Sequence, residues 1–143
     1  MIKIEVKQHI LAPVDQVVKT LLAHQQLDRF FNAKFQLIKT QNAGEIKGGK
    51  GAVRQITIGK IVFEEQIVSA SHNHICYRII GKGPVFDHQG DIYLTPDDVD
   101  IKSTQLDYVI KFKGPKWLPD FILMFLVERD IQNAMNKLAV YFI

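Results

Sequence analysis

The feature that most constrains this chain is its C-terminal run from Pro119 to Ile143, which carries the only long helical pattern in the sequence. Pro119 suits a first helical turn, where a missing N–H costs nothing, and Asp120 places a negative charge beside the positive end of the helix dipole. Apolar residues then recur at spacings of three and four: Met124, Val127, Ile131, Met135, Leu138 and Phe142. We therefore predict one helix of roughly 36 Å with a single buried stripe.

The rest of the chain has the patterns of strands and short helices. Residues 2–10 alternate strictly between apolar and polar side chains, which is typical of a strand with one buried face. Pro13 then begins a short helix over 13–22, and a second short helical piece covers 24–31. Six further strands are predicted between glycine, proline and asparagine turns, at 35–40, 52–58, 60–70, 74–80, 86–95 and 101–112.

This order of elements predicts an α+β fold. Strands joined by such short links pair antiparallel, because parallel pairing needs crossovers of about a dozen residues or more. A sheet with one apolar face and a helix with one apolar stripe bury both when the sheet curves around the helix. We expect a helix-grip fold, in which a curved seven-stranded antiparallel sheet wraps around the C-terminal helix. The two short helices lie between the first and second strands. At 143 residues the chain fits one domain, 1–143.

Composition and motifs exclude several classes of function. The 18 Lys and Arg residues against 15 Asp and Glu are scattered along the chain, so nucleic-acid binding is not indicated. The single cysteine, Cys76, lies in an apolar run, which rules out a disulfide framework and predicts a buried, inert thiol. His72 and His74 are too few ligands for a metal site, and the GGKG segment is a turn, so we expect neither a metal nor a cofactor.

The distribution of apolar residues also predicts where the protein works. Charged residues at Lys3, Glu5 and Lys7 interrupt the opening strand, so it does not have the pattern of a secretory signal. The longest apolar run, 121–127, is too short to cross a bilayer. We expect a cytoplasmic protein with at most peripheral membrane contact. Because 121–127 is apolar all round, its outward side needs a cover, and we expect the loop GPKWLP (114–119) to supply it. A second subunit and a membrane surface are the alternatives.

Five polar side chains fall on the inward, apolar face of their strands when the period of two is counted: Arg54, Glu65, Tyr77, His88 and Tyr108. Burying an unpaired charge costs several kcal/mol, so we predict that Arg54 and Glu65 pair across neighbouring strands. The pair could be a structural ion pair that holds the strands in register, or an anchor for a polar head group. His88 could be structural or could move a proton near pH 7. The two tyrosines could be core aromatics or could orient a ligand.

The opening segment 2–32, the strand pair 50–70, the segment CYRIIGKGPVFDHQGDIYLTP and the amphipathic C-terminal helix together resemble the START-related SRPBCC superfamily. Ala12-Pro13, Gly51, Arg54, Glu65, Tyr77 and Gly90 are among the positions that carry the likeness. The polyketide cyclase/dehydrase and lipid-transport group is the most similar part of that superfamily. The resemblance implies a hydrophobic cavity between the sheet and the long helix, which would hold a lipid, a polyketide-like molecule or an aromatic ligand.

Three functions follow as hypotheses from this resemblance and from the inward polar residues. The first is binding of a small hydrophobic ligand, gated by the loop 81–87, with contacts from Arg54, Glu65, Tyr77, His88, Tyr108, Phe86 and Phe125. The second is a cyclase or dehydratase in which His88 or Glu65 transfers a proton. The third is a protein-interaction module that binds a protein partner through the outer sheet or the long helix, where the apolar turn near Phe125 could form the contact. We expect the protein to be a monomer or a homodimer. No nucleophile, base and orienting group fall together in the sequence, so binding without turnover is the main prediction.

Overall fold

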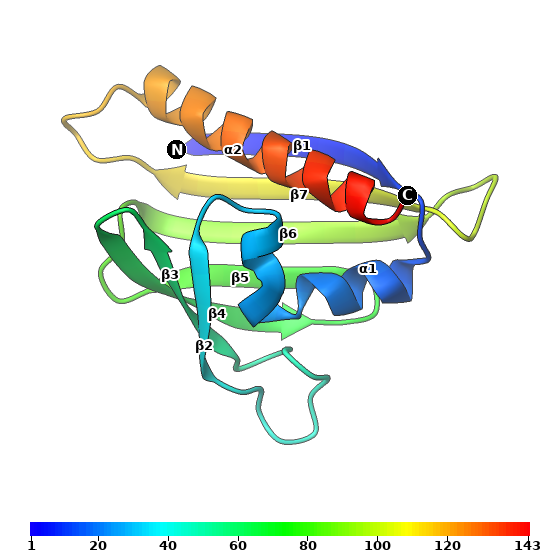
Figure 1. Cartoon of the computed structure of the whole chain (residues 1–143). Coiled ribbons are helices and arrows are strands. Elements are labelled where there is room, and N and C mark those ends of the chain that lie inside the picture. Colours follow the sequence, from blue (N-terminus) through cyan, green and yellow to red (C-terminus); the bar gives the residue numbers. More distant parts are fainter.

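Seven strands pair in the order β1-β7-β6-β5-β4-β3-β2 in the computed structural model of the protein, which describes residues 1–143. Each neighbouring pair of strands is antiparallel. The strands are β1 (Ile2–Ile10), β2 (Lys34–Lys39), β3 (Val53–Ile58), β4 (Ile61–Ala70), β5 (His74–Ile80), β6 (Phe86–Pro96) and β7 (Thr104–Lys113). The long helix brings the chain back beside β1, so the first and last elements of the sequence lie next to each other (Figure 1).

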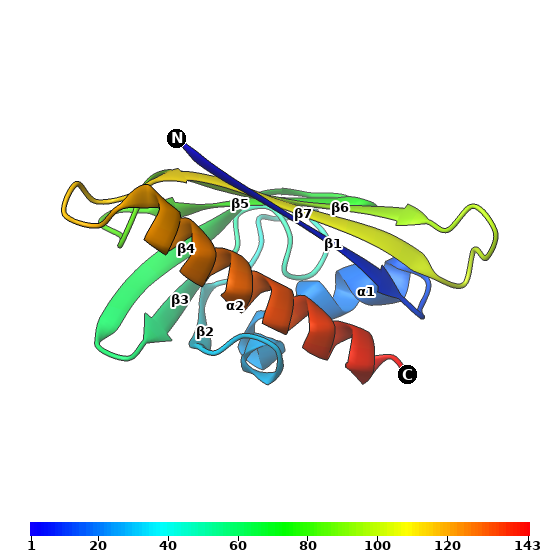
Figure 2. The ribbon, with the colours of Figure 1, turned by 90° about the horizontal axis from the view of Figure 1, so that it is seen from above.

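Three helical segments lie on one side of this sheet. They are α1 (Val14–Leu21), the 3₁₀ helix η1 (His24–Arg29) and α2 (Asp120–Tyr141). Figure 2 shows the sheet bending at β3 and β2 toward the side that carries the helices, so that α2 is enclosed between β1 and the β2–β3 edge. The curved sheet, the long C-terminal helix and the short helices after β1 confirm the predicted helix-grip fold.

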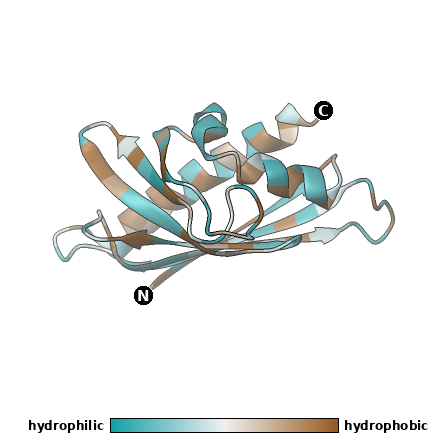
Figure 3. Ribbon diagram, turned by 90° about the horizontal axis from the view of Figure 1, so that it is seen from below, coloured by the Kyte–Doolittle hydropathy of each residue, from teal (hydrophilic) through white to brown (hydrophobic).

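The strand periodicity explains why the sheet has one buried face. Ile2, Ile4 and Val6 of β1 are buried and alternate with exposed charged residues. They face residues of β7 that alternate in the same way, with Ile4 opposite Ile110. Hydrophobic residues therefore alternate with hydrophilic ones along the strands (Figure 3). Each fully buried aliphatic side chain of this kind contributes about 1.5–3 kcal/mol to folding.

The buried stripe of α2 differs from the predicted one at its first position. Ile131, Met135 and Leu138 are buried, as the spacing predicts, and Ala134 is buried with them, whereas Met124 is exposed. Leu123 packs against the core in its place. Residues four apart stay closer to one helix face than residues three apart, so the stripe continues backward from Val127 to Leu123. The predicted last strand also begins later, at Thr104, because the carboxylate of Asp97 accepts backbone N–H groups of Val99 and Asp100 in a turn.

Candidate ligand-binding cavity

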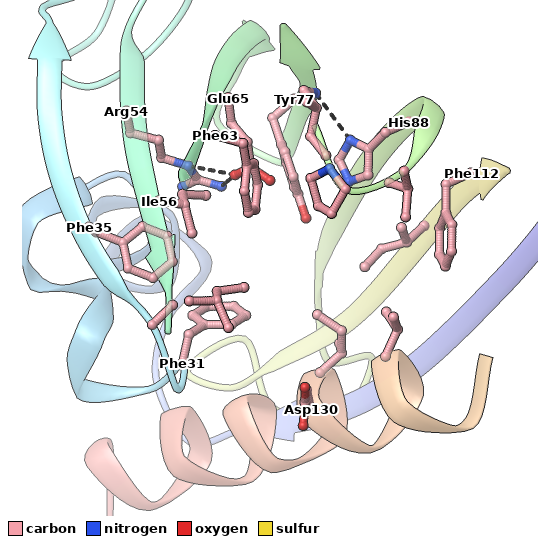
Figure 4. Close-up of a pocket in the computed structure, with 18 of the residues that line it drawn as sticks. Phe31, Phe35, Arg54, Ile56, Phe63, Glu65, Tyr77, His88, Phe112 and Asp130 are labelled. Atoms are coloured by element: carbon pink, nitrogen blue, oxygen red, sulfur yellow. Dashed lines mark hydrogen bonds and ion pairs between the residues drawn. The ribbon is translucent and has the colours of Figure 1, made fainter. Parts of the chain in front are cut away.

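A cavity of about 250 Å³ lies between the inner face of the sheet and α2 (Figure 4). Fourteen of the 20 residues that line it are hydrophobic. The lining residues come from β2 to β7, from α2, from the loop before β2 and from the loop between β5 and β6. The hydrophobic ones include Phe31, Phe35, Ile56, Phe63, Ile79, Val85 and Val127. The polar lining includes Arg54, Glu65, Tyr77, His88 and Tyr108, all five of the inward polar residues predicted from the strand periodicity.

Arg54 and Glu65 form a buried ion pair on one wall of the cavity. The two residues lie opposite each other in the β3–β4 register. Nε and Nη2 of Arg54 both donate to Oε1 of Glu65, at 2.9 and 2.7 Å. Both hydrogen bonds use Oε1, so Oε2 of Glu65 receives none. Every polar side-chain atom that is fully enclosed in the protein has a hydrogen-bond partner, so Oε2 is not fully enclosed. Oε2 is therefore open to the cavity that Glu65 lines.

His24 holds the other side of the Arg54 guanidinium. Nε2 of His24 donates to the carbonyl oxygen of Gly48 at 2.7 Å, because a carbonyl can only accept. Nδ1 then accepts from Nη1 of Arg54 at 3.2 Å, which requires a neutral imidazole. Burial and the adjacent positive charge of Arg54 lower the pKa of His24 to about 4, which agrees with this assignment. Sequence reasoning missed His24 because its partners are far away in the chain and periodicity carries no information about them.

The GGKG segment provides the acceptor for His24. Gly48 has a φ of +77°, and a Cβ at this position would lie 2.3 Å from the backbone oxygen of Leu22. Only glycine fits against the end of α1 in this conformation. The segment is thus a turn, as predicted, and it also positions Arg54 through His24.

Aromatic rings contact the guanidinium of Arg54 as well. Its Cζ atom lies 4.9 Å from the centre of the Tyr77 ring and 5.4 Å from the centre of the Phe35 ring. Such cation–π contacts favour the charged guanidinium where water is excluded. Burial is the largest single influence and disfavours the charge, but Glu65, Tyr77 and Tyr108 together outweigh it, so the pKa of Arg54 is raised. For Glu65, burial disfavours the ionised carboxylate and raises the pKa, and this effect outweighs the opposing effect of Arg54.

The hydroxyl groups of Tyr77 and Tyr108 are hydrogen-bonded to each other across the cavity wall. One hydroxyl donates to the other, which leaves one hydroxyl hydrogen of the pair without an acceptor. Burial raises the pKa of both tyrosines, so both are neutral at pH 7. Gly90 lies opposite Tyr77 in the β5–β6 register and makes room for its ring, since a Cβ there would lie 2.4 Å from Cζ of Tyr77.

An irregularity in β6 positions His88. The β6–β7 register shifts between Phe86 and Gln89, where Asp87 has a φ of +50°. Here the backbone N–H of Ile79 donates to Nδ1 of His88 at 3.2 Å, so the ring carries its proton on Nε2. Burial and the charge of Arg54 lower the pKa of His88 to about 4. At pH 7 it is therefore a neutral hydrogen-bond donor on the cavity wall.

Two of the predicted ligand-contacting residues do not line the cavity. Phe86 is exposed, because the register shift after it reverses the face that strict alternation assigns to it. Pro84 and Val85 of the preceding loop line the cavity instead. Phe125 is exposed too and points away from the face of α2 that carries Val127 and Ile131. Conversely, Phe31, Phe35 and Asp130 line the cavity and were not predicted.

A curved antiparallel sheet closed by one long helix around a largely apolar cavity defines a START-like helix-grip protein of the SRPBCC superfamily. The chain belongs to the family described as polyketide cyclase / dehydrase and lipid transport, whose model matches residues 1–142. The family model therefore confirms the resemblance found in the sequence.

Solved structures share this fold at low sequence identity. A START superfamily protein from Mycobacterium smegmatis aligns with a TM-score of 0.81 at 10% identity and covers 98% of this chain and 96% of that one. The protein XoxI from Bacillus cereus aligns with a TM-score of 0.77 at 14% identity, covering 99% and 96%. A Thermus thermophilus protein aligns with a TM-score of 0.77 at 10% identity, covering 97% and 95%. No curated protein sequence matches the chain.

Two other features of the structure bear on function. None of its helices combines the length and the apolar character needed to span a membrane. No three His, Cys, Asp or Glu side chains are grouped closely enough to hold a metal ion.

Proposed function

We propose that this protein binds a small hydrophobic ligand in the cavity and holds the polar end of that ligand at Arg54, Glu65, Tyr77, Tyr108 and His88. One observation carries the proposal: the polar wall of an otherwise apolar cavity has unused hydrogen-bonding capacity. Oε2 of Glu65, one hydroxyl hydrogen of the tyrosine pair and the Nε2–H of His88 have no partner in the protein. These groups are open to the cavity. A hydrophobic ligand that excluded water from them would lose about 1–3 kcal/mol for each group left unpaired, so its polar end should pair with them.

The charges and the volume of the cavity limit the chemistry of the ligand. Arg54 and Glu65 neutralise each other, and His88 is neutral at pH 7. The unused groups therefore suit an uncharged oxygen, such as a carbonyl or hydroxyl group, better than a free carboxylate or an ammonium group. A volume of about 250 Å³ lies just below the usual range of small-molecule pockets, which is roughly 300–1,000 Å³. The ligand is thus small, or only part of a longer molecule enters.

Native mass spectrometry of the protein purified from its own host, followed by organic extraction, tests this proposal. We expect a bound small molecule that leaves an empty protein after extraction. Val127→Trp, which fills the cavity from α2, should abolish the bound species. Phe125→Trp, on the outward face of the same helix, should retain it and serves as the matched control. Absence of any ligand, together with no binding of fatty alcohols or flavonoids in titrations, would contradict the proposal.

Proton transfer by Glu65 is the second candidate function. The observation that favours it is the raised pKa of a carboxyl group whose Oε2 is free and whose neighbours include the tyrosine hydroxyls. Ionised Glu65 could take a proton from a carbon next to a ligand carbonyl. The C–H electron pair would form an enolate, whose oxygen a tyrosine hydroxyl and Arg54 would stabilise. His88 is the weaker base of the two, because its pKa is lowered to about 4 whereas the pKa of Glu65 is raised.

Deuterium exchange separates the two functions. The ligand recovered from the protein is incubated in D₂O with the protein and with its Glu65→Gln variant. An enzyme would incorporate deuterium next to the carbonyl at a rate that Glu65→Gln reduces at least about a hundredfold, the usual size of a general-base contribution. A binding protein would give the uncatalysed rate in both cases.

A further inference from the structure

The end of the molecule beside the cavity carries a large exposed apolar surface. Figures 1 and 2 place the β3–β4 turn, the β5–β6 loop and the β7–α2 loop at this same end. Trp117 is 80% exposed, Phe121 74% and Phe125 65%. The loop GPKWLP therefore does not cover the first turns of α2, contrary to the expectation from sequence, because its own Trp117 faces solvent. We name this region the apolar end surface; its other members are Ile58, Ile61, Val62, Phe86, Ile122, Met124 and Leu126.

Unpaired lysines surround the apolar end surface. Lys60 lies in the β3–β4 turn, Lys82 in the β5–β6 loop and Lys116 in the β7–α2 loop, and none of them forms an ion pair. A fourth lysine, Lys113, pairs with Asp87 at 3.4 Å. Asp120, at the start of α2, is the one further acidic residue in these loops and the adjoining helix turn. The three loop tips thus carry a net positive charge around aromatic side chains.

We propose that the apolar end surface docks on an anionic lipid membrane. Tryptophan and phenylalanine side chains partition into the boundary between head groups and acyl chains, and lysines beside them are attracted to anionic lipids. A second copy of the chain is a poorer occupant, because a two-fold contact through this surface would bring the lysines of one copy close to the like-charged lysines of the other. The charge of the loops selects an anionic lipid surface over self-association.

This docking would bring the cavity to the membrane. Pro84 and Val85, which line the cavity, belong to the same β5–β6 loop as Lys82. Val127 and Ile131 line it from the helix whose first turns carry Phe121 and Phe125. A hydrophobic ligand could thus pass between the bilayer and the cavity without crossing bulk water. The docking itself does not depend on ligand binding, and it can be tested with the empty protein.

Co-sedimentation of the purified protein with lipid vesicles tests the proposal. We expect binding to vesicles of phosphatidylcholine with phosphatidylglycerol, and much weaker binding to phosphatidylcholine alone. The triple variant Trp117→Ser/Phe121→Ser/Phe125→Ser should bind about tenfold or more weakly. The matched control Val99→Ser/Ile101→Ser removes exposed apolar residues from the β6–β7 loop at the opposite end (Figure 1) and should bind like the unchanged protein.

Charge reversal tests the electrostatic part independently. Lys60→Glu/Lys82→Glu/Lys116→Glu should also weaken binding about tenfold or more, and raising the salt concentration should weaken binding of the unchanged protein. Lys19→Glu/Lys102→Glu/Lys137→Glu changes the net charge equally at positions on α1, the β6–β7 loop and the C-terminal half of α2, and should have little effect. Circular dichroism verifies that each variant folds.

Two results would overturn the proposal. One is equal binding, or none, to both kinds of vesicle by a folded protein. The other is a dimer in sedimentation equilibrium that the Trp117→Ser/Phe121→Ser/Phe125→Ser variant converts to a monomer, because the apolar end surface would then be covered by a second subunit.

Discussion

Arg54 and Glu65 meet through a single carboxylate oxygen: Nε and Nη2 of Arg54 both donate to Oε1, at 2.9 and 2.7 Å, and Oε2 remains free. An ion pair that served stability alone would place the two donors on two oxygens, as in the usual bidentate geometry. Here the third side of the guanidinium is taken by His24 at 3.2 Å. The arrangement fixes Arg54 from two sides and leaves Glu65 able to contact a ligand.

Removing one partner of this pair should lower the stability of the protein more than removing both. Arg54→Met or Glu65→Leu leaves an uncompensated buried charge and should lower the free energy of unfolding by about 3–5 kcal/mol. The double variant Arg54→Met/Glu65→Leu should be more stable than either single variant, because no buried charge remains. Urea unfolding of the four proteins measures this difference. Additive losses in the double variant would show that the two charges do not stabilise each other.

The exposed ion pair between Lys7 and Asp107 is the matched control for that cycle. Its atoms lie 3.8 Å apart on the outer side of the β1–β7 pair, with side chains 73% and 40% exposed. Replacing either residue by Met should cost less than about 1 kcal/mol, because water screens exposed charges. A cost equal to that at Arg54 would mean that burial is not the reason for the large effect.

His24 and His88 should make the protein less stable in acid. In the folded protein their pKa values are lowered to about 4, whereas in the unfolded chain histidine titrates near 6.5. The unfolded chain therefore takes up protons first, so the free energy of unfolding falls as the pH drops from about 6.5 to 4. The full shift corresponds to about 3 kcal/mol per histidine.

NMR titration of the histidine ring protons measures the two pKa values directly. Both rings should stay neutral down to about pH 4. Glu65 has the opposite effect on stability, because its raised pKa favours the folded protein at low pH. The contribution of His24 to the pH dependence is therefore obtained by subtraction. The free energy of unfolding of His24→Gln is compared with that of the unchanged protein at each pH. Titration of His24 or His88 near 6.5 would contradict the hydrogen-bond assignments.

Gly90→Ala should displace the Tyr77 ring. The added Cβ would lie 2.4 Å from Cζ of Tyr77, and the buried ring cannot move without breaking its contact with Tyr108. We expect a loss of about 1–3 kcal/mol in urea unfolding, as for other over-packed cores, together with weaker ligand binding. Gly59→Asn is the control: nothing lies within 4 Å of that position, and asparagine tolerates its positive φ. Equal stability of the two variants would argue against a tightly packed Tyr77.

Cys76 should react slowly with thiol reagents. Burial, with a smaller contribution from Asp91, raises the pKa of its thiol to about 11. The thiolate fraction at pH 8 is then about a hundredfold lower than for a thiol of pKa 9, and only the thiolate reacts. Colour release from a disulfide reagent should therefore be slow in the folded protein and fast after unfolding in urea. Rapid labelling of the folded protein would show that β5 opens locally.

Local periodicity in the sequence identified most of the polar cavity wall. Alternation along β3, β4, β5 and β7 placed Arg54, Glu65, Tyr77 and Tyr108 on the inner face, where the structure has them. Alternation failed at Phe86, because one irregularity in β6 reverses the face of every residue on its far side. Helical spacing failed at Met124, which is exposed. The buried face of the helix continues from Val127 back to the residue four positions earlier, Leu123, which packs against the core instead.

The order of elements, the antiparallel pairing of the sheet and the inward face of its strands were determined by the sequence alone, since they follow from spacings of two and of three to four residues. Only the tertiary structure decided that His24 and Gly48 hold Arg54, that Phe35 and Phe31 complete the cavity, and that Trp117 and Phe121 are left uncovered. These contacts join segments that are distant in the chain. They depend on how far the sheet curves and where the loops lie, and no local pattern of side chains specifies either.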